Sequence, residues 1–524
     1  YIMEKKIIFW FLILLFVLLW FLVVGQVGHS AIFGEINLID EGQYAAWVYQ
    51  MLNGKMIYRD IYVQYGPLMV FPIYLLMKFF GETIFFVYLW SSIGAFLGYV
   101  LGMLTLRQLK VEKSVFIISL TTLLIVPGIN IRQWIGVLIF ILLSRSYETK
   151  SLLLALLTGV FMVVAFLQSV EIGLFTFLIC AFYIGFRFIK SKKLEDEFIT
   201  SLFILLGTVL SFVSFFAIFQ SQGWLSSYIY STKEVAVSIS GMNLPNGKGL
   251  PVILQNVDTS SPFLFAKLIF SKNALFYLSL LLLLIFLPFF IIRLSQKNNH
   301  ERDILGLLIT IFAILIYFSI VGRSGHYISV FPFVVILLAY FVSESKGHKL
   351  FKKHRLMLYS IFLTIFCMYI LRHIAIYRFS LVPKFNELAN TPVSRIYPHI
   401  ISFVQSKDIL ELKNFFELNR KCNDFIYILN NAPGLYFLLE IKNPTRYDLP
   451  LLAGVIEKRQ EIVNDLIKHK PLCVLEDMTS WAVDEVSDEE RMPEVFKYVK
   501  RNYQPYKRIG HFLIYRLVDD KKRK

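Results

Sequence analysis

The sequence has few charged residues for its length. Asp, Glu, Lys and Arg together account for 17% of its 524 residues, whereas soluble domains carry roughly 25%. Hydrophobic residues make up 56%, and phenylalanine alone occurs 50 times. The composition therefore excludes the string of soluble domains that length alone would indicate.

The sequence also contains no internal repeat, no low-complexity segment and no convincing set of metal ligands. Cysteine is scarce, with four residues in the chain. Cys180 and Cys367 lie within apolar runs, whereas Cys422 and Cys473 lie at or near expected strands outside the membrane, where a disulfide is chemically permitted. We expect these last two thiols to be buried and unpaired. No cofactor is identified with certainty, and a divalent metal is left as an option.

Long apolar runs fill the part of the chain up to residue 373. Runs of about 17–25 residues are long enough to cross about 30 Å of hydrocarbon as helices, and backbone in lipid must satisfy its hydrogen bonds internally. The sequence therefore predicts a polytopic α-helical membrane protein with about 11 transmembrane helices. The expected spans are 7–24, 84–106, 114–128, 131–144, 151–167, 172–188, 198–219, 274–292, 304–321, 327–343 and 356–373. The first exceeds the apolar core of a signal peptide, so we expect an uncleaved anchor.

The net charge of +16 follows the membrane topology. Lys and Arg cluster at alternate junctions between the expected spans, which is typical of cytoplasmic loops. The basic junctions are 5–6, 107–113, 145–150, 187–193, 293–302 and 346–355. We therefore expect a plasma (inner) membrane protein whose N-terminus is cytoplasmic and whose chain beyond residue 373 is extracytoplasmic. The excess of basic over acidic residues therefore does not indicate a nucleic-acid partner.

Two long connections are expected on the outer side. The loop 25–83 contains short apolar segments at 44–52 and 68–80, which suit helices that lie along the membrane surface. The connection 220–272 is rich in Gly and Pro and shows little helical periodicity. Long connections of this kind are usually functional or mobile.

The chain changes character after the last expected span. Residues 1–373 form the predicted membrane domain, and residues 374–524 form a predicted extracytoplasmic α/β domain with some parallel strand pairing. The helical stretches expected there are 408–419, 455–469 and 488–502. The strands expected there are 425–429, 472–475, 506–509 and 512–517.

Polar side chains converge at the outer ends of the expected spans. Carboxylates this close to a bilayer are costly, which favours a functional role. A carboxylate can act as general base, and the guanidinium fork of Arg suits phosphate. The pattern indicates a substrate that is half lipid and half anionic head group. The group comprises Asp40, Glu41, Arg59, Asp60, Gln64, Tyr65, Arg132, Gln133, Gln168, Glu171, Arg323, Ser324 and His326.

These residues also have structural interpretations. Glu41 suits a capping or solvated acid, and Arg59-Asp60 suits a local ion pair that pins the loop. Arg323 suits an anchor to lipid phosphates, and His326 suits a satisfied interfacial histidine. For the aromatic residues of the first loop, an interfacial belt is favoured over a sugar platform. These aromatic residues are Trp47, Tyr49, Tyr58, Tyr62 and Tyr65.

The segment DEGQYAAWVYQMLNGKMIYRDIYVQYGP, residues 40–67, resembles the first outer loop of the GT-C membrane glycosyltransferases. The resemblance is greatest to bacterial proteins similar to protein mannosyltransferases and aminoarabinose transferases. The segments FLQSVEIGLF (166–175), GRSGHYISVFP (322–332) and NPTRYDLP (443–450) are similar to other parts of such proteins. The sequence departs from the family at one point, because no acid follows Ser324, and this departure argues against a metal or acid role at that turn.

The resemblance implies a chemistry and roles for the polar residues. A hexosyl or pentosyl group would pass from a polyprenyl-phosphate donor to an extracytoplasmic glycan, lipid or protein acceptor, with inversion. Asp40 would be the base, with Glu41 beside it, and Arg59 or Arg323 would hold the carrier phosphate. The further substrate-binding candidates are Asp60, Tyr65, Glu171 and His326.

Two other functions remain open at this point. A transporter or flippase of lipid-linked sugars needs polar groups through the depth of the membrane, whereas here they concentrate at the outer end. A non-catalytic membrane scaffold with a receptor-like outer domain is also compatible with the sequence.

Overall fold

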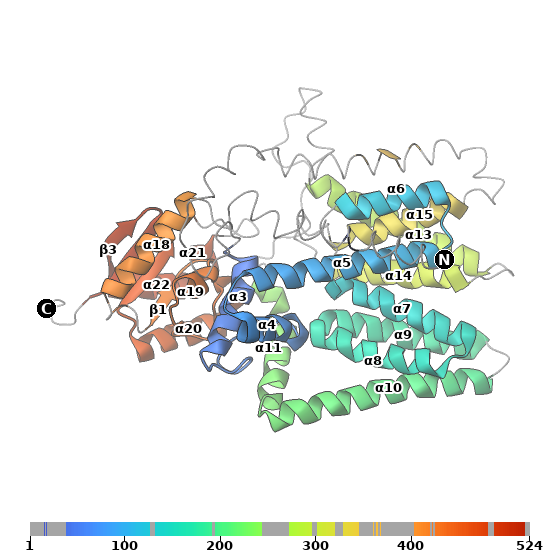
Figure 1. Cartoon of the computed structure of the whole chain (residues 1–524), viewed down its shortest axis with the longest axis horizontal. Helices are drawn as coiled ribbons and strands as arrows, with labels where there is room; N and C mark the ends of the chain where they lie inside the picture. The colour runs from blue at the N-terminus through green and yellow to red at the C-terminus, as the bar shows by residue number, and fades with distance from the viewer. Residues whose placement is uncertain are drawn as a thin grey trace. The chain divides into compact units, whose positions relative to one another are not determined.

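The structure is a computed structural model, and it describes residues 38–125, 131–190, 194–243, 272–295, 301–319, 329–344, 403–419, 425–479 and 487–518, with single positions at 15, 17, 360, 363, 364, 367 and 422. The chain divides into two compact units, and their helices and strands are labelled in Figure 1. The helical unit comprises Tyr1–Phe21, Ser91–Phe215 and Gly249–Arg378. The mixed unit comprises Leu22–Trp90, Phe216–Lys248 and Phe379–Lys524.

Every expected span between residues 84 and 343 coincides with a helix. These helices are α5 (Phe85–Gln108), α6 (Lys113–Ile125), α7 (Ile131–Thr149), α8 (Leu152–Gln168), α9 (Val170–Lys190), α10 (Leu194–Ser221), α13 (Lys272–Ser295), α14 (Glu301–Ser319) and α15 (Phe331–Glu344). By length and composition, five of the described helices can cross a membrane: α5, α9, α10, α13 and α14. The expected spans 7–24 and 356–373 lie outside the described residues except at single positions, so the full count stays a prediction.

Helices of the helical unit approach one another closely at glycines. A Cβ atom on Gly159 of α8 would collide with the carbonyl oxygen of Ile204, and one on Gly207 of α10 would collide with that of Leu156. Small residues serve this purpose in lipid, because helices there associate by close packing and not by a hydrophobic driving force. The close packing of α8 against α10 therefore depends on glycine, which has no side chain, at positions 159 and 207.

The mixed unit combines the loop 25–83 with the C-terminal elements. Its N-terminal part contains α3 (Asp40–Leu52), a 3-10 turn η1 (Pro67–Met69) and α4 (Phe71–Phe80). These helices cover the two short apolar segments expected in the loop. Helix α11 (Leu225–Asn243) lies within the connection 220–272, for which little helical structure was expected. That expectation was wrong for α11, and residues 244–271 lie outside the described part of the chain.

The C-terminal part contains a four-stranded sheet, as the alternating pattern predicted. The strand order is β1-β2-β4-β3, with β1 parallel to β2 and the other pairs antiparallel. The strands are β1 (Ile426–Ile428), β2 (Cys473–Asp477), β3 (Tyr503–Ile509) and β4 (Phe512–Leu517). The helices and turns are α18 (Phe403–Leu418), α19 (Gly434–Leu438), η5 (Pro450–Ala453), α20 (Ile456–His469), α21 (Asp488–Arg491) and α22 (Pro493–Asn502).

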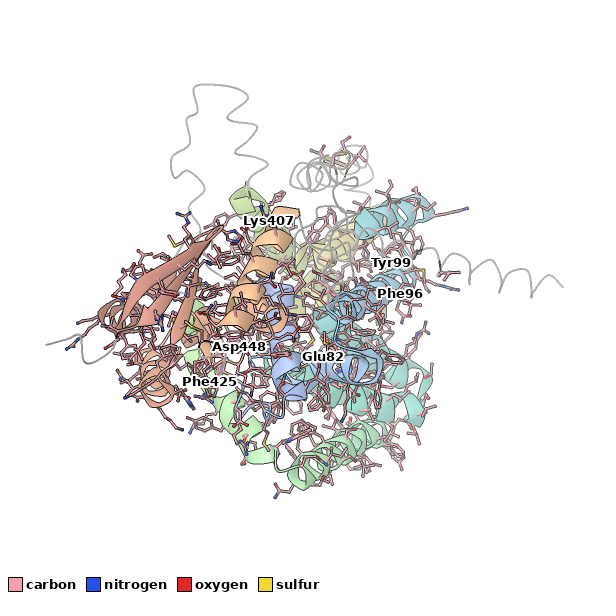
Figure 2. All side chains as sticks on the ribbon, turned by 60° about the vertical axis from the view of Figure 1, so that its left-hand side comes forward. Glu82, Phe96, Tyr99, Lys407, Phe425 and Asp448 are labelled. Carbon is pink, nitrogen blue, oxygen red and sulfur yellow. A yellow bond between two sulfur atoms is a disulfide. The ribbon has the colours of Figure 1, made fainter. Side chains whose placement is uncertain are left out.

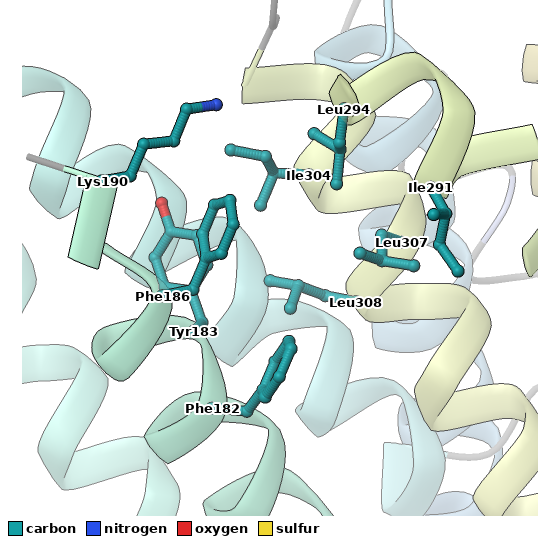
Figure 3. Close-up of a pocket in the computed structure, with 9 residues that line it drawn as sticks. All are labelled: Phe182, Tyr183, Phe186, Lys190, Ile291, Leu294, Ile304, Leu307 and Leu308. Carbon is teal, nitrogen blue, oxygen red and sulfur yellow. The ribbon is translucent and has the colours of Figure 1, made fainter. Parts of the chain in front are cut away.

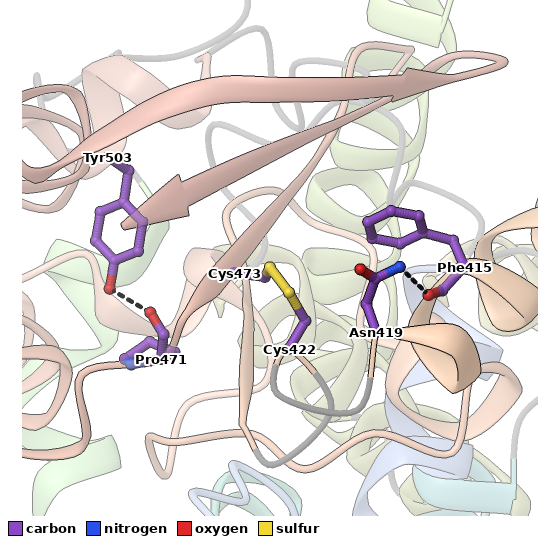
Figure 4. The surroundings of a disulfide bond; sticks show 6 residues. All are labelled: Phe415, Asn419, Cys422, Pro471, Cys473 and Tyr503. Atoms are coloured by element: carbon purple, nitrogen blue, oxygen red, sulfur yellow. Dashed lines mark hydrogen bonds between the residues drawn. A yellow bond between two sulfur atoms is a disulfide. The ribbon is translucent and has the colours of Figure 1, made fainter. Parts of the chain in front are cut away.

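Cys422 and Cys473 form a disulfide, so the expectation of two unpaired thiols was wrong (Figure 4). The cause is strand pairing. Ile426 of β1 lies opposite Cys473 of β2 in parallel register, which brings the residues just before β1 next to the start of β2. The two Cα atoms are 5.3 Å apart, within the range that a disulfide requires.

We expect Gly207→Ala to destabilise the helical unit, because the new methyl group collides with the backbone of α8. The matched control is Gly185→Ala on α9, where a Cβ atom meets nothing within 4 Å. Both changes gain up to about 1 kcal/mol of helix propensity, so their difference isolates the collision. Thermal unfolding in detergent should show Gly207→Ala roughly 1–3 kcal/mol less stable than the control. Equal unfolding temperatures would show that α8 and α10 are not in backbone contact.

We expect the disulfide to stabilise the mixed unit, because it closes a sequence separation of 51 residues. Replacing both cysteines by serine should cost roughly 2–4 kcal/mol. Thiol labelling of the denatured protein from native membranes should modify Cys180 and Cys367 without reduction and all four cysteines after it. Labelling of Cys422 and Cys473 before reduction would contradict the pairing.

Candidate functional site

The carboxylate pair lies in the first turn of α3, where acidic side chains stabilise a helix N-terminus. Asp40 is exposed, whereas Glu41 is buried with 8% of its surface accessible. Burial, with the neighbouring charge of Asp40, raises the pKa of Glu41 to about 8. Its Oε2 has no hydrogen-bond partner in the described part of the structure. Two adjacent acids thus have different environments, and Glu41 carries a proton at neutral pH.

Helix α3 is held by helix α19. The backbone N–H of Gly434 donates to the carbonyl oxygen of Leu38 at 2.9 Å. A Cβ atom at Gly434 would lie 3.1 Å from the Cα atom of Gly42, so the two glycines permit close contact. Farther along, the rings of Tyr49 and Phe437 meet edge to face at 6.2 Å. The C-terminal part of the chain therefore positions the carboxylate pair.

One face of α3 combines a carboxylate, amide and indole donors, and aromatic rings. Asp40, Gln43, Tyr44 and Trp47 share this face, because residues three and four apart are neighbours on a helix. The ring of Tyr65 stacks on Tyr44 at 6.0 Å and 11°, and Trp47 meets both rings edge-on. The side-chain nitrogens of Gln43 and Trp47 are buried and have no partner among the described residues. Buried donors in native proteins are nearly always hydrogen-bonded, so these two are exceptions in the described part of the structure.

Arg59 and Asp60 form the local ion pair that the sequence allowed as one interpretation. Arg59 Nε and Nη2 donate to the two carboxylate oxygens of Asp60 at 2.8 Å each. The carboxylate also accepts the backbone N–H of Met56 at 2.9 Å. The hydrogen bond from Arg59 lowers the pKa of Asp60. The charge of Arg59 is thereby compensated within the loop.

The NPTRYDLP segment, residues 443–450, binds the end of α3 through Asp448, which is labelled in Figure 2. The buried Asp448 accepts Gln50 Nε2 at 2.5 Å and Asn443 Nδ2 at 2.6 Å. Lys55 Nζ donates to Gln50 Oε1 at 2.5 Å and to the carbonyl oxygen of Asn443 at 2.9 Å. Burial raises the pKa of Asp448 to about 6, opposed by the charge of Lys55. The sequence resemblance singled out this segment but gave no reason for it, and the structure supplies one.

Arg446 joins three separate segments in the mixed unit. Its guanidinium pairs with Glu234 of α11 at 2.8 Å and with Glu461 of α20 at 2.7 Å. It also lies over the Tyr62 ring at 5.6 Å, and its carbonyl oxygen accepts the Tyr62 N–H at 2.7 Å. Sequence reasoning missed Arg446 and Glu234, because only the fold brings such distant residues together.

The aromatic residues of the first loop do not form an interfacial belt. Trp47 and Tyr62 are 0% exposed, Tyr58 is 2% exposed and Tyr49 is 6% exposed. The expectation was wrong because elements such as α19 and the NPTRYDLP segment cover them. Tyr65 is partly buried.

Glu171 belongs to the helical unit and has a partner there. Its Oε2 lies 3.0 Å from Arg132 Nη2, so the first turns of α9 and α7 are linked by an ion pair. A Cβ atom on Gly173 would lie 2.5 Å from Phe166, which explains the glycine after this tight turn. Gln168 is buried at the same turn, and its Oε1 has no partner in the described ranges.

The remaining expected site residues are not described. Arg323, Ser324 and His326 lie outside the described residues, so their roles stay predictions. Among the described residues, no group of three or more His, Cys, Asp or Glu side chains is arranged to hold a metal ion.

Comparisons with known proteins support the fold. No protein-family model and no curated protein sequence matches the chain. The crystal structure of ArnT from Cupriavidus metallidurans in the apo state aligns with a TM-score of 0.50 and 12% identity, over 98% of each chain. This chain therefore shares the fold of ArnT over nearly its whole length.

Two further solved structures are similar at a lower TM-score. An Archaeoglobus fulgidus oligosaccharyltransferase tethered with an acceptor peptide has a TM-score of 0.47 and 12% identity, over 97% of this chain and 74% of the other. ArnT from Cupriavidus metallidurans bound to undecaprenyl phosphate has a TM-score of 0.46 and 11% identity, over 98% of each chain.

The raised pKa of Glu41 gives stability a pH dependence with a definite sign. Between the ordinary pKa of 4.5 and about 8, the folded protein retains a proton that the unfolded chain has lost. The free energy of unfolding should therefore fall as the pH rises through this window. Glu41→Gln should flatten the dependence of the free energy of unfolding on pH and raise the unfolding temperature at pH 8.

The control for this prediction is Glu457→Gln, an exposed acid in the first turn of α20. The free energy of unfolding of this variant should depend on pH in the same way as that of the wild type. A Glu41→Gln profile parallel to that of the wild type would show that Glu41 ionises normally.

Proposed function

We propose that the chain is an integral-membrane glycosyltransferase that transfers one sugar from a polyprenyl-phosphate donor to an extracytoplasmic glycan, lipid or protein acceptor. The observation that carries the proposal is the face of α3, where the exposed Asp40 adjoins a stacked and partly buried tyrosine pair. The ArnT-like fold and the resemblance of residues 40–67 support it.

In the proposed reaction, Asp40 acts as the general base. An acceptor hydroxyl gives its proton to the Asp40 carboxylate while its oxygen attacks the anomeric carbon of the donor sugar. The bond from that carbon to the phosphate oxygen breaks, the configuration inverts, and the carrier phosphate leaves as an anion. Because Glu41 is buried and protonated, only one negative charge lies at the start of α3, and this limits repulsion of an anionic donor.

The leaving phosphate requires a cation to stabilise its developing charge. Arg59 is compensated by Asp60 in the loop, and this pairing favours Arg323 for the role. Glu171 pairs with Arg132, so we propose that it acts by orienting that guanidinium. Asp60, Tyr65 and His326 remain the other proposed binding residues.

The sugar would bind along the shared face of α3. Asp40 is the exposed polar group of this face, and the partly buried Tyr44–Tyr65 pair beside it offers an apolar surface. Sites that combine aromatic walls with a few convergent polar groups are typical of small-molecule binding. A divalent metal is not needed for this proposal.

The orientation proposed from the basic clusters places residues 374–524 outside the cytoplasm. The Cys422–Cys473 disulfide supports this placement, because disulfides persist in oxidising compartments. The proposed N-terminus is cytoplasmic, in a plasma (inner) membrane.

The decisive test compares a deletion strain that is complemented with wild type, with Asp40→Asn or with Glu411→Gln, at matched membrane levels. Glu411 is an exposed acid on α18 and serves as the control. Asp40→Asn should slow transfer by roughly 10²–10⁴-fold, since it removes the general base. Mass spectrometry should then show loss of one glycan residue and accumulation of a phosphate-linked sugar.

Two outcomes would contradict the proposal at different levels. Wild-type behaviour of Asp40→Asn would show that Asp40 is not the base. A deletion that leaves both the glycan and the phosphate-linked sugar pools unchanged would overturn the transferase function and favour the scaffold interpretation.

A further inference from the structure

The helical unit contains a crevice of about 400 Å³ between one end of α9 and the facing ends of α13 and α14 (Figure 3). One wall is aromatic and comes from α9, with Phe182 and Phe186. The opposite wall is aliphatic and includes Ile291 and Leu294 of α13 and Leu308 of α14. The volume falls within the range of small-ligand sites, about 300–1,000 Å³.

Lys190 provides the charge at this crevice, as the only Lys or Arg among the described residues that line it. The neighbouring Arg187 is neutralised, because it pairs with Glu197 at 2.8 Å and with Glu301 at 3.0 Å. Lys190 is exposed and lies 5.5 Å from the centre of the Phe186 ring. In the described part of the chain, no carboxylate pairs with Lys190, so its charge is available to an anionic ligand.

The depth of the crevice matches the layers of a bilayer. Lys190 is the last residue of α9 and belongs to the basic junction 187–193, which the charge pattern assigns to the cytoplasmic side. From Lys190 to Phe182 the helix rises about 12 Å, which leads from the head-group level into the hydrocarbon. A cation thus lies at the level of lipid phosphates, and apolar walls lie at the level of acyl chains.

We propose that this crevice binds an anionic phospholipid of the cytoplasmic leaflet. One acyl chain would lie between α9 and the α13–α14 pair, and the phosphate would contact Lys190. Basic pockets between transmembrane helices on the cytoplasmic side bind anionic head groups. A peptide is disfavoured, because the described walls are apolar apart from Tyr183 and Lys190 and offer little to satisfy its backbone. The proposal is independent of the proposed transferase reaction.

The test measures binding of phosphatidylglycerol and phosphatidylcholine to the purified full chain by native mass spectrometry. Lys190→Gln should weaken phosphatidylglycerol binding about fivefold, the factor for about 1 kcal/mol per lysine at an anionic surface. Lys190→Arg should retain binding. The matched control is Lys113→Gln, an exposed lysine in the first turn of α6 that does not line the crevice.

A second variant tests the apolar part of the site. The Ile291 side chain is 54% exposed, so Ile291→Trp narrows the crevice without disturbing the core. It should reduce phosphatidylglycerol binding while the unfolding temperature in lipid-free detergent stays unchanged. An equal loss of phosphatidylglycerol binding in Lys113→Gln and Lys190→Gln would overturn the proposed binding site. Equal affinity of the wild type for the two lipids would overturn it as well. Preferential binding of a polyprenyl phosphate through Lys190 would overturn the assignment to a phospholipid.

Discussion

The geometry of the carboxylate pair depends on the buried polar network of the NPTRYDLP segment. Asp448 binds Gln50 near the end of α3, and Arg446 pairs with Glu234 and Glu461. Removing one member would leave a buried charge or donor unpaired, which costs more than the net value of a single hydrogen bond. The network therefore specifies one position for the loop that contains α3, and α19 contributes by contacting the start of α3.

The helical unit is stabilised by different means, because its surroundings are different. In lipid, apolar surface gives helices no reason to associate, so close backbone contact matters, as at Gly159 and Gly207. Several charged side chains at the helix ends form ion pairs. Arg293, for example, binds Asp303 at 3.1 Å and Glu344 at 2.7 Å. These pairs link helix ends without placing charge in the apolar interior.

Much of the fold follows from local sequence patterns. Apolar runs of sufficient length predicted the helices between residues 84 and 343, and alternating short patterns predicted the sheet of the C-terminal part. The carboxylate pair was also identifiable, because acidic residues beside a span are costly and stand out. The inferences about helices and sheet succeed because hydrophobic periodicity is a property of neighbouring residues, whereas the role of the carboxylate pair stays a prediction.

The sequence by itself determined the membrane class, most helix positions and the candidate residues Asp40 and Glu41. Only the tertiary structure decided that Cys422 and Cys473 pair, that Trp47 and its aromatic neighbours are buried, and that Glu41 holds a proton while Asp40 is exposed. Each of these outcomes depends on contacts between segments far apart in the chain. Burial and strand register arise only when such segments pack together, and no local pattern encodes them.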